Sequence, residues 1–148
     1  GRVPCLEDDG QHIFESGAIV QYILARYGDG KLAPKPSSDE FANFLQWFHF
    51  AEGMLMPPVN TLVVETRILS AEKSNPTNIA RAKKLLGRML AAIEAGLGDK
   101  DYLIGDFTAA DIMCGHAAIV AARNGGDIAD KPAVTAYVKR LQARPALE

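Results

Sequence analysis

Residues 1–23 read G-R-V-P-C-L-E-D-D-G-Q-H-I-F-E-S-G-A-I-V-Q-Y-I, and the sequence pattern changes from strand to helix within this stretch. Arg2–Glu7 and Gln11–Phe14 have the composition of two short strands. Asp8-Asp9-Gly10 between them is typical of a tight hairpin turn, because glycine readily adopts a positive φ. From Glu15 onward the apolar residues recur at helical spacing. The stretch therefore predicts a hairpin followed by a helix, which is not a complete sheet.

The sequence that follows is helical in pattern and is separated from this stretch by a linker. Gly28–Ser38 is rich in Gly, Pro and Ser, and Ser37-x-x-Glu40 predicts a capping box that starts the next helix. Helical periodicity then continues to about Leu69, and Pro57-Pro58 predicts a kink or break inside it.

Three further helices are predicted from their start signals. Asn75-Pro76 combines an N-cap with proline at the first helical position, and that helix ends near residue 97. Thr108-Ala-Ala-Asp111 predicts a capping box, and the apolar sequence through Ala122 predicts a buried central helix. Lys131-Pro132 starts the last helix, which Pro145 ends. The fold class is therefore mostly α: a β-hairpin plus helix over residues 1–28, a linker over 29–38 and an all-helical domain over 39–148.

Composition excludes several classes of protein. The 148 residues are 48% hydrophobic and 23% charged, which is ordinary for a globular chain, and the formal net charge of −2 gives no basic surface for nucleic acid. No apolar run is long enough to span a membrane and no secretory signal is visible. Cys5 and Cys114 are too few for a disulfide framework, so we expect a cytoplasmic protein. The scattered His12, His49 and His116 predict no metal site.

Three segments resemble the cytosolic glutathione transferases, in particular a bacterial and fungal subgroup. Residues 1–23 resemble the end of the family's thioredoxin-like domain, and G-D-F-T-A-A-D-I-M at 105–113 resembles the capping-box segment of its all-helical domain. W-F-H-F-A-E-G-M-L-M-P-P at 47–58 resembles its first long helix. The resemblance implies that residues 1–28 correspond to the C-terminal part of the thioredoxin-like domain. The β-α-β unit that precedes this part in the family, and the thiolate-activating residue within it, have no counterpart in the sequence.

The resemblance also implies a glutathione site. Val3 and Pro4 match the residues that precede and form the family's cis-proline, where the backbone of Val3 would bind the cysteinyl part of glutathione. Glu15 and Ser16 match the pair that holds the γ-glutamyl ammonium and carboxylate at a helix N-terminus. The alternative is that Val3-Pro4 is an ordinary edge-strand proline and that Ser16 only caps the helix.

Trp47, His49 and Glu52 lie on the helix that borders the electrophile pocket in the family, although a partly buried structural role also explains His49. The implied function is a transferase that joins glutathione to a small electrophile, as a homodimer and without a metal. The alternatives are a non-catalytic binding or regulatory module of the same fold, or a glutathione-dependent isomerase, dehalogenase or reductase. The catalytic residue is unknown.

Overall fold

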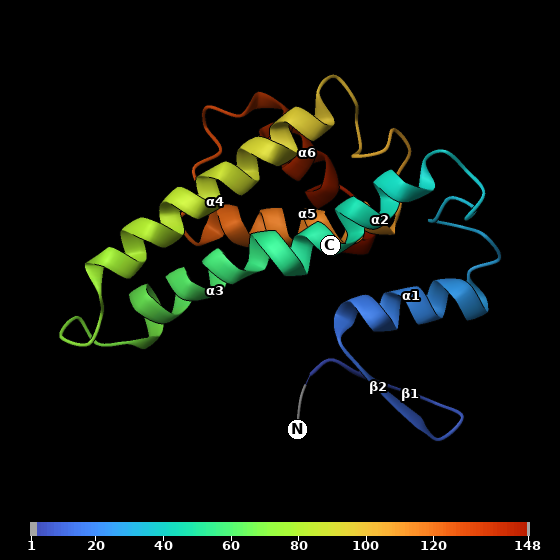
Figure 1. Ribbon diagram of the computed structural model, residues 1–148, viewed down its shortest axis with the longest axis horizontal. Helices are drawn as coiled ribbons and strands as arrows, with labels where there is room; N and C mark the ends of the chain where they lie inside the picture. Colours follow the sequence, from blue (N-terminus) through green and yellow to red (C-terminus); the bar gives the residue numbers. More distant parts are fainter. Residues whose placement is uncertain (1–2, 148) are drawn as a thin grey trace.

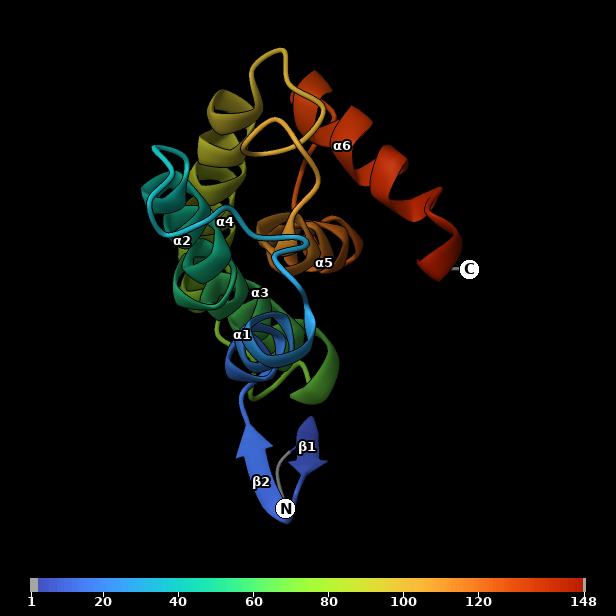
Figure 2. The ribbon, with the colours of Figure 1, turned by 90° about the vertical axis from the view of Figure 1, so that its right-hand side faces the viewer.

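The computed structural model describes residues 3–147. Its first part, residues 3–28, is here called the N-terminal unit and contains the strands β1 (Cys5–Asp8) and β2 (Gln11–Phe14) and the helix α1 (Ser16–Tyr27). The hairpin lies at one extreme of the molecule, and α1 lies between the hairpin and the other helices (Figures 1 and 2).

The second part, residues 41–142, is here called the helical body. It contains α2 (Phe41–Phe50), the π-helical turn η1 (Ala51–Leu55), α3 (Met56–Val63), the π-helical turn η2 (Val64–Ile68), α4 (Pro76–Leu97), α5 (Ala109–Arg123) and α6 (Pro132–Gln142). A short 3-10 turn, η3 (Pro145–Leu147), follows it. The predicted fold class, mostly α with an initial hairpin and helix, is confirmed.

The hairpin has the register that a two-residue turn imposes. β1 and β2 are antiparallel, with Cys5 opposite Phe14 and Asp8 opposite Gln11. Asp9 and Gly10 have φ values of 49° and 76°, and a type I′ turn needs positive φ at both central residues. Among the described residues the first strand begins at Cys5 and ends at Asp8, and the cis Val3–Pro4 peptide bond precedes it. Arg2, the predicted start, lies outside the described residues.

A polar cluster joins the tip of the hairpin to the end of α1. The Asp8 carboxylate accepts hydrogen bonds from the hydroxyls of Tyr22, at 2.8 Å, and Tyr27, at 2.5 Å. Arg26 adds ion pairs to Asp8 at 3.8 Å and to Asp9 at 3.4 Å. These contacts fix the angle between the hairpin and the helix although no residue of α1 is fully buried.

The linker is attached to the helical body at its midpoint. The carbonyl of Leu32 accepts a 2.8 Å hydrogen bond from the backbone N–H of Ala109, the first residue of α5. The predicted capping box at Ser37 and Glu40 is wrong, because α2 begins only at Phe41. Residues 35–41 instead form two successive turns, in which the N–H of Ser38 bonds to the carbonyl of Lys35 and the N–H of Phe41 to that of Ser38.

The predicted irregularity at Pro57-Pro58 takes the form of a π-helical turn. In a regular helix the N–H of Met56 would bond to the carbonyl of Glu52, but here it bonds to Ala51, five residues back. Neither proline has an N–H to donate, so the helix widens over η1 and continues as α3 (Figure 1).

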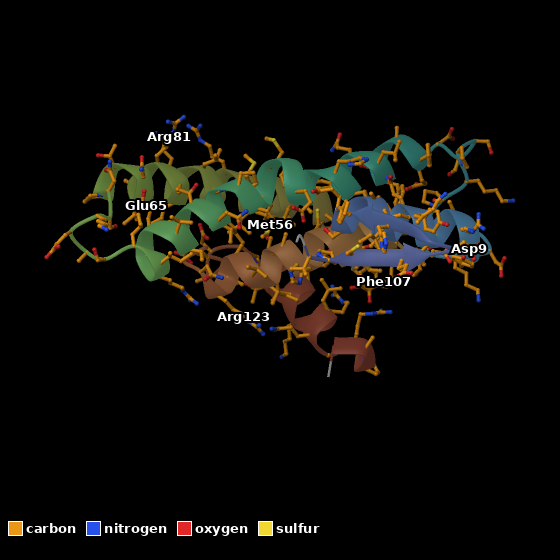
Figure 3. All side chains as sticks on the ribbon, turned by 90° about the horizontal axis from the view of Figure 1, so that it is seen from below. Asp9, Met56, Glu65, Arg81, Phe107 and Arg123 are labelled. Carbon is orange, nitrogen blue, oxygen red and sulfur yellow. The ribbon has the colours of Figure 1, made fainter. Side chains whose placement is uncertain are left out.

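A buried carboxylate, Glu65, and a half-buried one, Glu94, fix the junctions between the later helices. Glu65 accepts from the backbone N–H of Asn75 and from Nδ2 of Asn78, both at 2.7 Å, and so joins η2 to the start of α4 (Figure 3). Asn75 caps α4 as predicted, accepting from the N–H of Thr77 at 2.9 Å. Glu94 on α4 accepts from the first N–H groups of α6.

Helix α5 forms the centre of the body, as its apolar sequence predicts. It packs against α2, α3, η1 and α6, and most of its residues are buried. The predicted capping box of Thr108 and Asp111 is present, and the Asp111 carboxylate also accepts from the N–H of Leu103 and from the hydroxyl of Tyr137, both at 3.0 Å. Burial, and then the charge of Asp111, raise the pKa of the Cys114 thiol, which donates to the carbonyl of Trp47 and stays protonated.

Candidate functional site

A small pocket lies where the N-terminal unit meets the helical body. Its volume is about 270 Å³, and it is lined by Val3, Pro4, Phe14, Glu15, Ser16 and Glu52. The first five come from the approach to β1 and from the connection between β2 and α1. The sixth comes from the π-helical turn η1. The structure therefore brings together the four residues predicted to bind glutathione and one of the three predicted to border the electrophile.

Val3 and Pro4 form one wall of the pocket. Their peptide bond is cis, as the family resemblance implies. The pairing of β1 with β2 begins at Cys5, so Val3 lies ahead of the strand ladder, and its side chain is 94% exposed. An extended ligand can therefore approach this part of the backbone in the way that one strand approaches another.

Glu15 and Ser16 line the pocket at the start of α1. Glu15 is the N-cap residue and has φ 72°, a left-handed conformation that costs a non-glycine residue about 1–3 kcal/mol. Ser16 is the first residue of the helix itself, so the alternative that it is the N-cap is wrong. The first turn of α1 contains no acidic residue, and the side chain of Glu15 makes no capping hydrogen bond. The backbone N–H groups of the first turn of α1 thus offer positive potential to an anion.

Glu52 closes the pocket from the side of the helical body. It is an exposed residue on η1, one turn before the proline pair. With Glu15 it gives the lining two carboxylates, and among residues 3–147 the lining has no Lys, Arg or His side chain. The pocket thus presents carboxylates for a cation and helix N–H groups for an anion. This pattern is complementary to an α-amino acid head group, which carries an ammonium and a carboxylate on one carbon.

Trp47 and His49 are not among the residues that line this pocket. Trp47 is 6% exposed and belongs to the core, where its ring packs against Gly96 of α4. His49 is exposed, and its Nε2 lies 3.5 Å from Nε2 of Gln21 on α1. Both lie on α2 ahead of the π-helical turn, and only Glu52 lies within that turn.

Phe14 is a pocket residue that the sequence interpretation omits. It ends β2 immediately before Glu15, and its side chain is half exposed. Its position next to the predicted Glu-Ser pair is the signal that points to it, because the ring of the last strand residue flanks the start of the helix.

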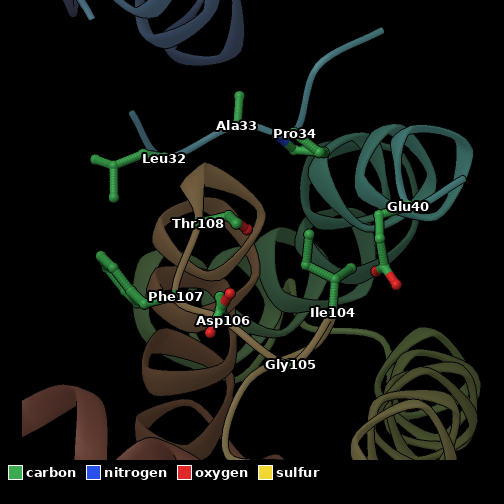
Figure 4. A pocket seen from close by; sticks show the side chains of 9 residues that line it. All are labelled: Leu32, Ala33, Pro34, Glu40, Ile104, Gly105, Asp106, Phe107 and Thr108. Carbon is green, nitrogen blue, oxygen red and sulfur yellow. The ribbon is translucent and has the colours of Figure 1, made fainter. Parts of the chain in front are cut away.

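A second hollow, of about 440 Å³, lies between the linker and the segment that precedes α5 (Figure 4). Leu32, Ala33 and Pro34 face Phe107 and Ile104 across it, and its charged residues are Glu40 and Asp106. It contains none of the predicted site residues, and Thr108 at its floor is already used in the capping box.

Residues 3–147 contain no group of three or more His, Cys, Asp and Glu side chains that could hold a metal ion. Within the same range, no helix combines the length and the apolar character that crossing a membrane requires.

Comparisons with known proteins identify the family. A family model described as "Glutathione S-transferase, N-terminal domain" matches residues 1–25, and one described as "Glutathione S-transferase, C-terminal domain" matches residues 55–145. "Glutathione S-transferase PM239X14" of Arabidopsis thaliana is 35% identical over 145 residues, and the match covers 93% of this chain and 66% of the relative. This chain thus spans about two thirds of that relative's length.

Two further similarities bear on function. "Elongation factor 1-gamma" of Homo sapiens is 33% identical over 114 residues, covering 76% of this chain and 24% of that protein. The crystal structure of the glutathione transferase URE2P6 from Phanerochaete chrysosporium, in complex with oxidized glutathione, superposes with a TM-score of 0.86 at 25% identity, covering 99% of this chain and 70% of that chain. From the match of the C-terminal family model over most of its length, we conclude that this chain belongs to the glutathione S-transferase family.

Proposed function

We propose that the pocket binds glutathione and that the protein transfers glutathione to a small electrophile. Val3 and Pro4 would pair with the cysteinyl part of the tripeptide. Ser16 and the first N–H groups of α1 would bind the γ-glutamyl carboxylate, and Glu15 would bind the γ-glutamyl ammonium. The observation that carries this proposal is the pocket itself, which gathers these four residues around one space.

The electrostatics of the pocket favour this orientation. A helix N-terminus stabilises an anion by about 0.3–1 kcal/mol at an exposed site, and the first turn of α1 has no acidic side chain to compete for it. Glu15, whose backbone is left-handed, directly precedes that turn, and its carboxylate makes no capping hydrogen bond to it. The ligand's two head-group charges would therefore have separate partners on adjacent residues.

The proposed chemistry is the attack of a thiolate. The glutathione thiol loses its proton, its sulfur forms a bond to an electrophilic carbon of the substrate, and the leaving group departs with its electron pair. The two carboxylates in the lining oppose formation of a thiolate close to them, so we expect the residue that stabilises the sulfur to lie elsewhere in the protein.

The test is the substitution Glu15→Ala in the full-length protein, with binding of reduced glutathione measured by isothermal titration calorimetry. We expect the dissociation constant to rise more than tenfold, because the ammonium loses its carboxylate partner. Glu72→Ala, at an exposed position in the turn between η2 and α4, is the matched control. Unchanged affinity in Glu15→Ala, with unchanged thermal unfolding, would refute the site assignment.

A second candidate function is a non-catalytic binding module of the same fold. The similarity to elongation factor 1-gamma favours it, because that protein carries a related segment over only 24% of its length. The two functions differ in one measurement. A transferase consumes reduced glutathione when mixed with a chloronitrobenzene and releases chloride, whereas a binding module gives the calorimetric signal for glutathione without chloride release.

The assembly and the location of the protein belong to the same proposal. We expect a homodimer, which sedimentation velocity would resolve from a monomer. We also expect a cytoplasmic protein, since Cys5 and Cys114 are both free thiols and fit a reducing compartment.

A further inference from the structure

The charged residues of this chain are segregated along its length. Residues 1–66 contain nine acidic and four basic residues, whereas residues 67–93 contain six basic residues and a single acidic one, Glu72. No ion pair among residues 3–147 involves any of the six, and all of them are exposed: Arg67, Lys73, Arg81, Lys83, Lys84 and Arg88. The formal net charge of −2 therefore conceals a strongly basic region, whose positive field acts on anionic partners.

This region forms one end of the molecule. The turn between η2 and α4 lies at the extreme of the long axis, away from the hairpin and from α1 (Figure 1). Arg81 lies on one side of the molecule near this end, and Arg123, the last residue of α5, lies on the opposite side (Figure 3). The guanidinium of Arg67 donates a 3.0 Å hydrogen bond to the backbone carbonyl of Arg123, so the charge of Arg67 is held here as well. The surface formed by residues 64–81 and Arg123 is here called the basic end.

An exposed apolar side chain lies among these cations. Ile68, the last residue of η2, is 69% exposed, more than any other large apolar residue of the helical body. Val64, at the start of the same π-helical turn, is also exposed. Arg67 directly precedes Ile68, and Lys73 lies in the turn that follows. Apolar side chains beside lysine and arginine are the means by which peripheral proteins enter the headgroup region of an anionic membrane.

Charge alone would also attract a nucleic acid, but the apolar side chain favours a lipid surface. A phosphate backbone pairs with cations and polar groups, whereas the boundary between headgroups and acyl chains also accepts an aliphatic side chain. Each Lys or Arg near an anionic membrane changes the affinity about fivefold, and the attraction falls off within about 8–10 Å. Arg81 lies five residues after the first residue of α4, about 7.5 Å along the helix, and is therefore within this range of the end.

We propose that the basic end docks on a membrane that contains anionic phospholipids, with Ile68 inserted among the headgroups and the surrounding cations against the lipid phosphates. The contact is peripheral and reversible, because one aliphatic side chain and a few cations bind far less tightly than a spanning helix. The inference does not depend on the proposed function, since none of the residues that line the glutathione pocket belongs to the basic end.

The experiment is co-sedimentation of the full-length protein with two kinds of vesicle, pure phosphatidylcholine and phosphatidylcholine with phosphatidylserine in a ratio of about 7 to 3. We expect the wild type to bind only the second kind, and less tightly as salt rises. Lys73→Gln/Arg81→Gln should weaken this binding about tenfold to thirtyfold, because two cations are lost. Lys35→Gln/Lys139→Gln removes two exposed lysines from the linker and α6 and is the matched control, which should change binding less than twofold.

Two further variants test the apolar contact and the sign of the charge effect. Ile68→Ser should weaken binding to the mixed vesicles about tenfold while leaving its salt dependence unchanged, because no charge is removed. Ile23→Ser, at an exposed position of α1, is the matched control and should bind as the wild type does. Glu72→Gln should strengthen binding about twofold to fivefold, because it removes the acidic residue of the basic end. A gain of binding cannot result from misfolding, and thermal unfolding of each variant shows whether the fold is intact.

Three outcomes would overturn the proposal. The first is that the wild type binds neither kind of vesicle, or binds both equally. The second is binding of a single-stranded RNA oligonucleotide that Lys73→Gln/Arg81→Gln loses and Ile68→Ser retains, without vesicle binding, which would assign the basic end to nucleic acid. The third is that Ile68→Ser dissociates an oligomer in sedimentation velocity without lipid, which would make this end an interface between copies of the chain. Loss of glutathione binding in any assay leaves the proposal standing and refutes only the proposed function.

Discussion

The N-terminal unit and the helical body are stabilised by different interactions, and the candidate site lies where they meet. Every buried hydrophobic side chain of the described residues lies between Phe44 and Leu141, within the helical body. The N-terminal unit has no fully buried residue among its strands and in α1. Its hairpin and helix are joined instead by the polar cluster around Asp8. The body is therefore the source of stability, and the unit contributes most of the pocket.

The contact between the two regions has room for an added methyl group at one position, although Val20 and Leu24 of α1 pack against the core. Gly17 of α1 faces Phe48 and Met113 of the body, and a Cβ added there would meet both at ordinary van der Waals distance, 3.5 and 3.7 Å. Gly96, inside the body, has no such space, because a Cβ there would collide with the ring of Trp47. A ligand that touches Ser16 and Glu52 together would bridge this contact, so binding and the docking of the two regions are expected to support each other.

The largest expected effect comes from a cavity in the helical body. Leu90 is 0% exposed on α4, and Leu90→Ala should lower the free energy of unfolding by about 2–5 kcal/mol. Leu85 on the same helix is 38% exposed, so Leu85→Ala is the matched control and should cost far less. Urea denaturation followed by circular dichroism measures both. Equal losses would mean that the two faces of α4 are not distinguished by burial.

A smaller effect is expected from overpacking at the same helix. Gly96→Ala should destabilise the protein by about 1–3 kcal/mol, because the new methyl group collides with the ring of the buried Trp47. Gly87→Ala meets no atom within 4 Å and should stabilise the helix by about 0.5–1 kcal/mol, since alanine loses less backbone entropy. Opposite signs in urea denaturation are the expected result. A neutral Gly96→Ala would indicate that the core has as much room at this position as the contact at Gly17.

Local signals in the sequence were sufficient for most of the fold. Asn75 before Pro76 and the Thr108–Asp111 capping box each place a helix start through residues a few positions apart, and both are confirmed. The hairpin turn at Asp9 and Gly10 depends on the same kind of local chemistry. At these three places tertiary packing does not override the local signal, so the sequence alone predicts the structure.

The sequence could not predict features that depend on long-range contacts. Ser37 and Glu40 have the spacing of a capping box, but the attachment of the linker at Leu32 and two successive turns delay α2 until Phe41. Trp47 and Glu52 were predicted to lie on one helix and to border the same pocket. In the structure Trp47 is a core residue of α2, whereas Glu52 lies in the π-helical turn η1 and lines the pocket. The partners of Asp8 lie 14 and 19 residues away on α1, and no short motif connects them.

The smallest effect should be confined to the N-terminal unit. Hydrogen bonds from Tyr27 and then Tyr22 lower the pKa of the Asp8 carboxyl. A carboxyl whose pKa is lowered by folding contributes its full stabilisation above its ordinary pKa, about 3.9, and loses it as the pH falls through the lowered value. The hairpin should therefore stay docked on α1 at neutral pH and loosen in acid.

Asp8→Asn should loosen the hairpin at neutral pH and remove this pH dependence, because the amide does not titrate in this range. Amide resonances of β1 and β2, followed by NMR from pH 6 to pH 2.5, measure the effect, and those of α4 and α5 report the helical body in the same spectra. We expect the hairpin resonances of Asp8→Asn to resemble those of the wild type in acid, while the body resonances at neutral pH stay unchanged. If the body resonances shift together with those of the hairpin, the two regions form one cooperative unit and the polar cluster is part of the global stability. A shift confined to the hairpin would show that the pocket wall at Glu15 and Ser16 can move while the core stays folded, which is the physical condition for a ligand to order it.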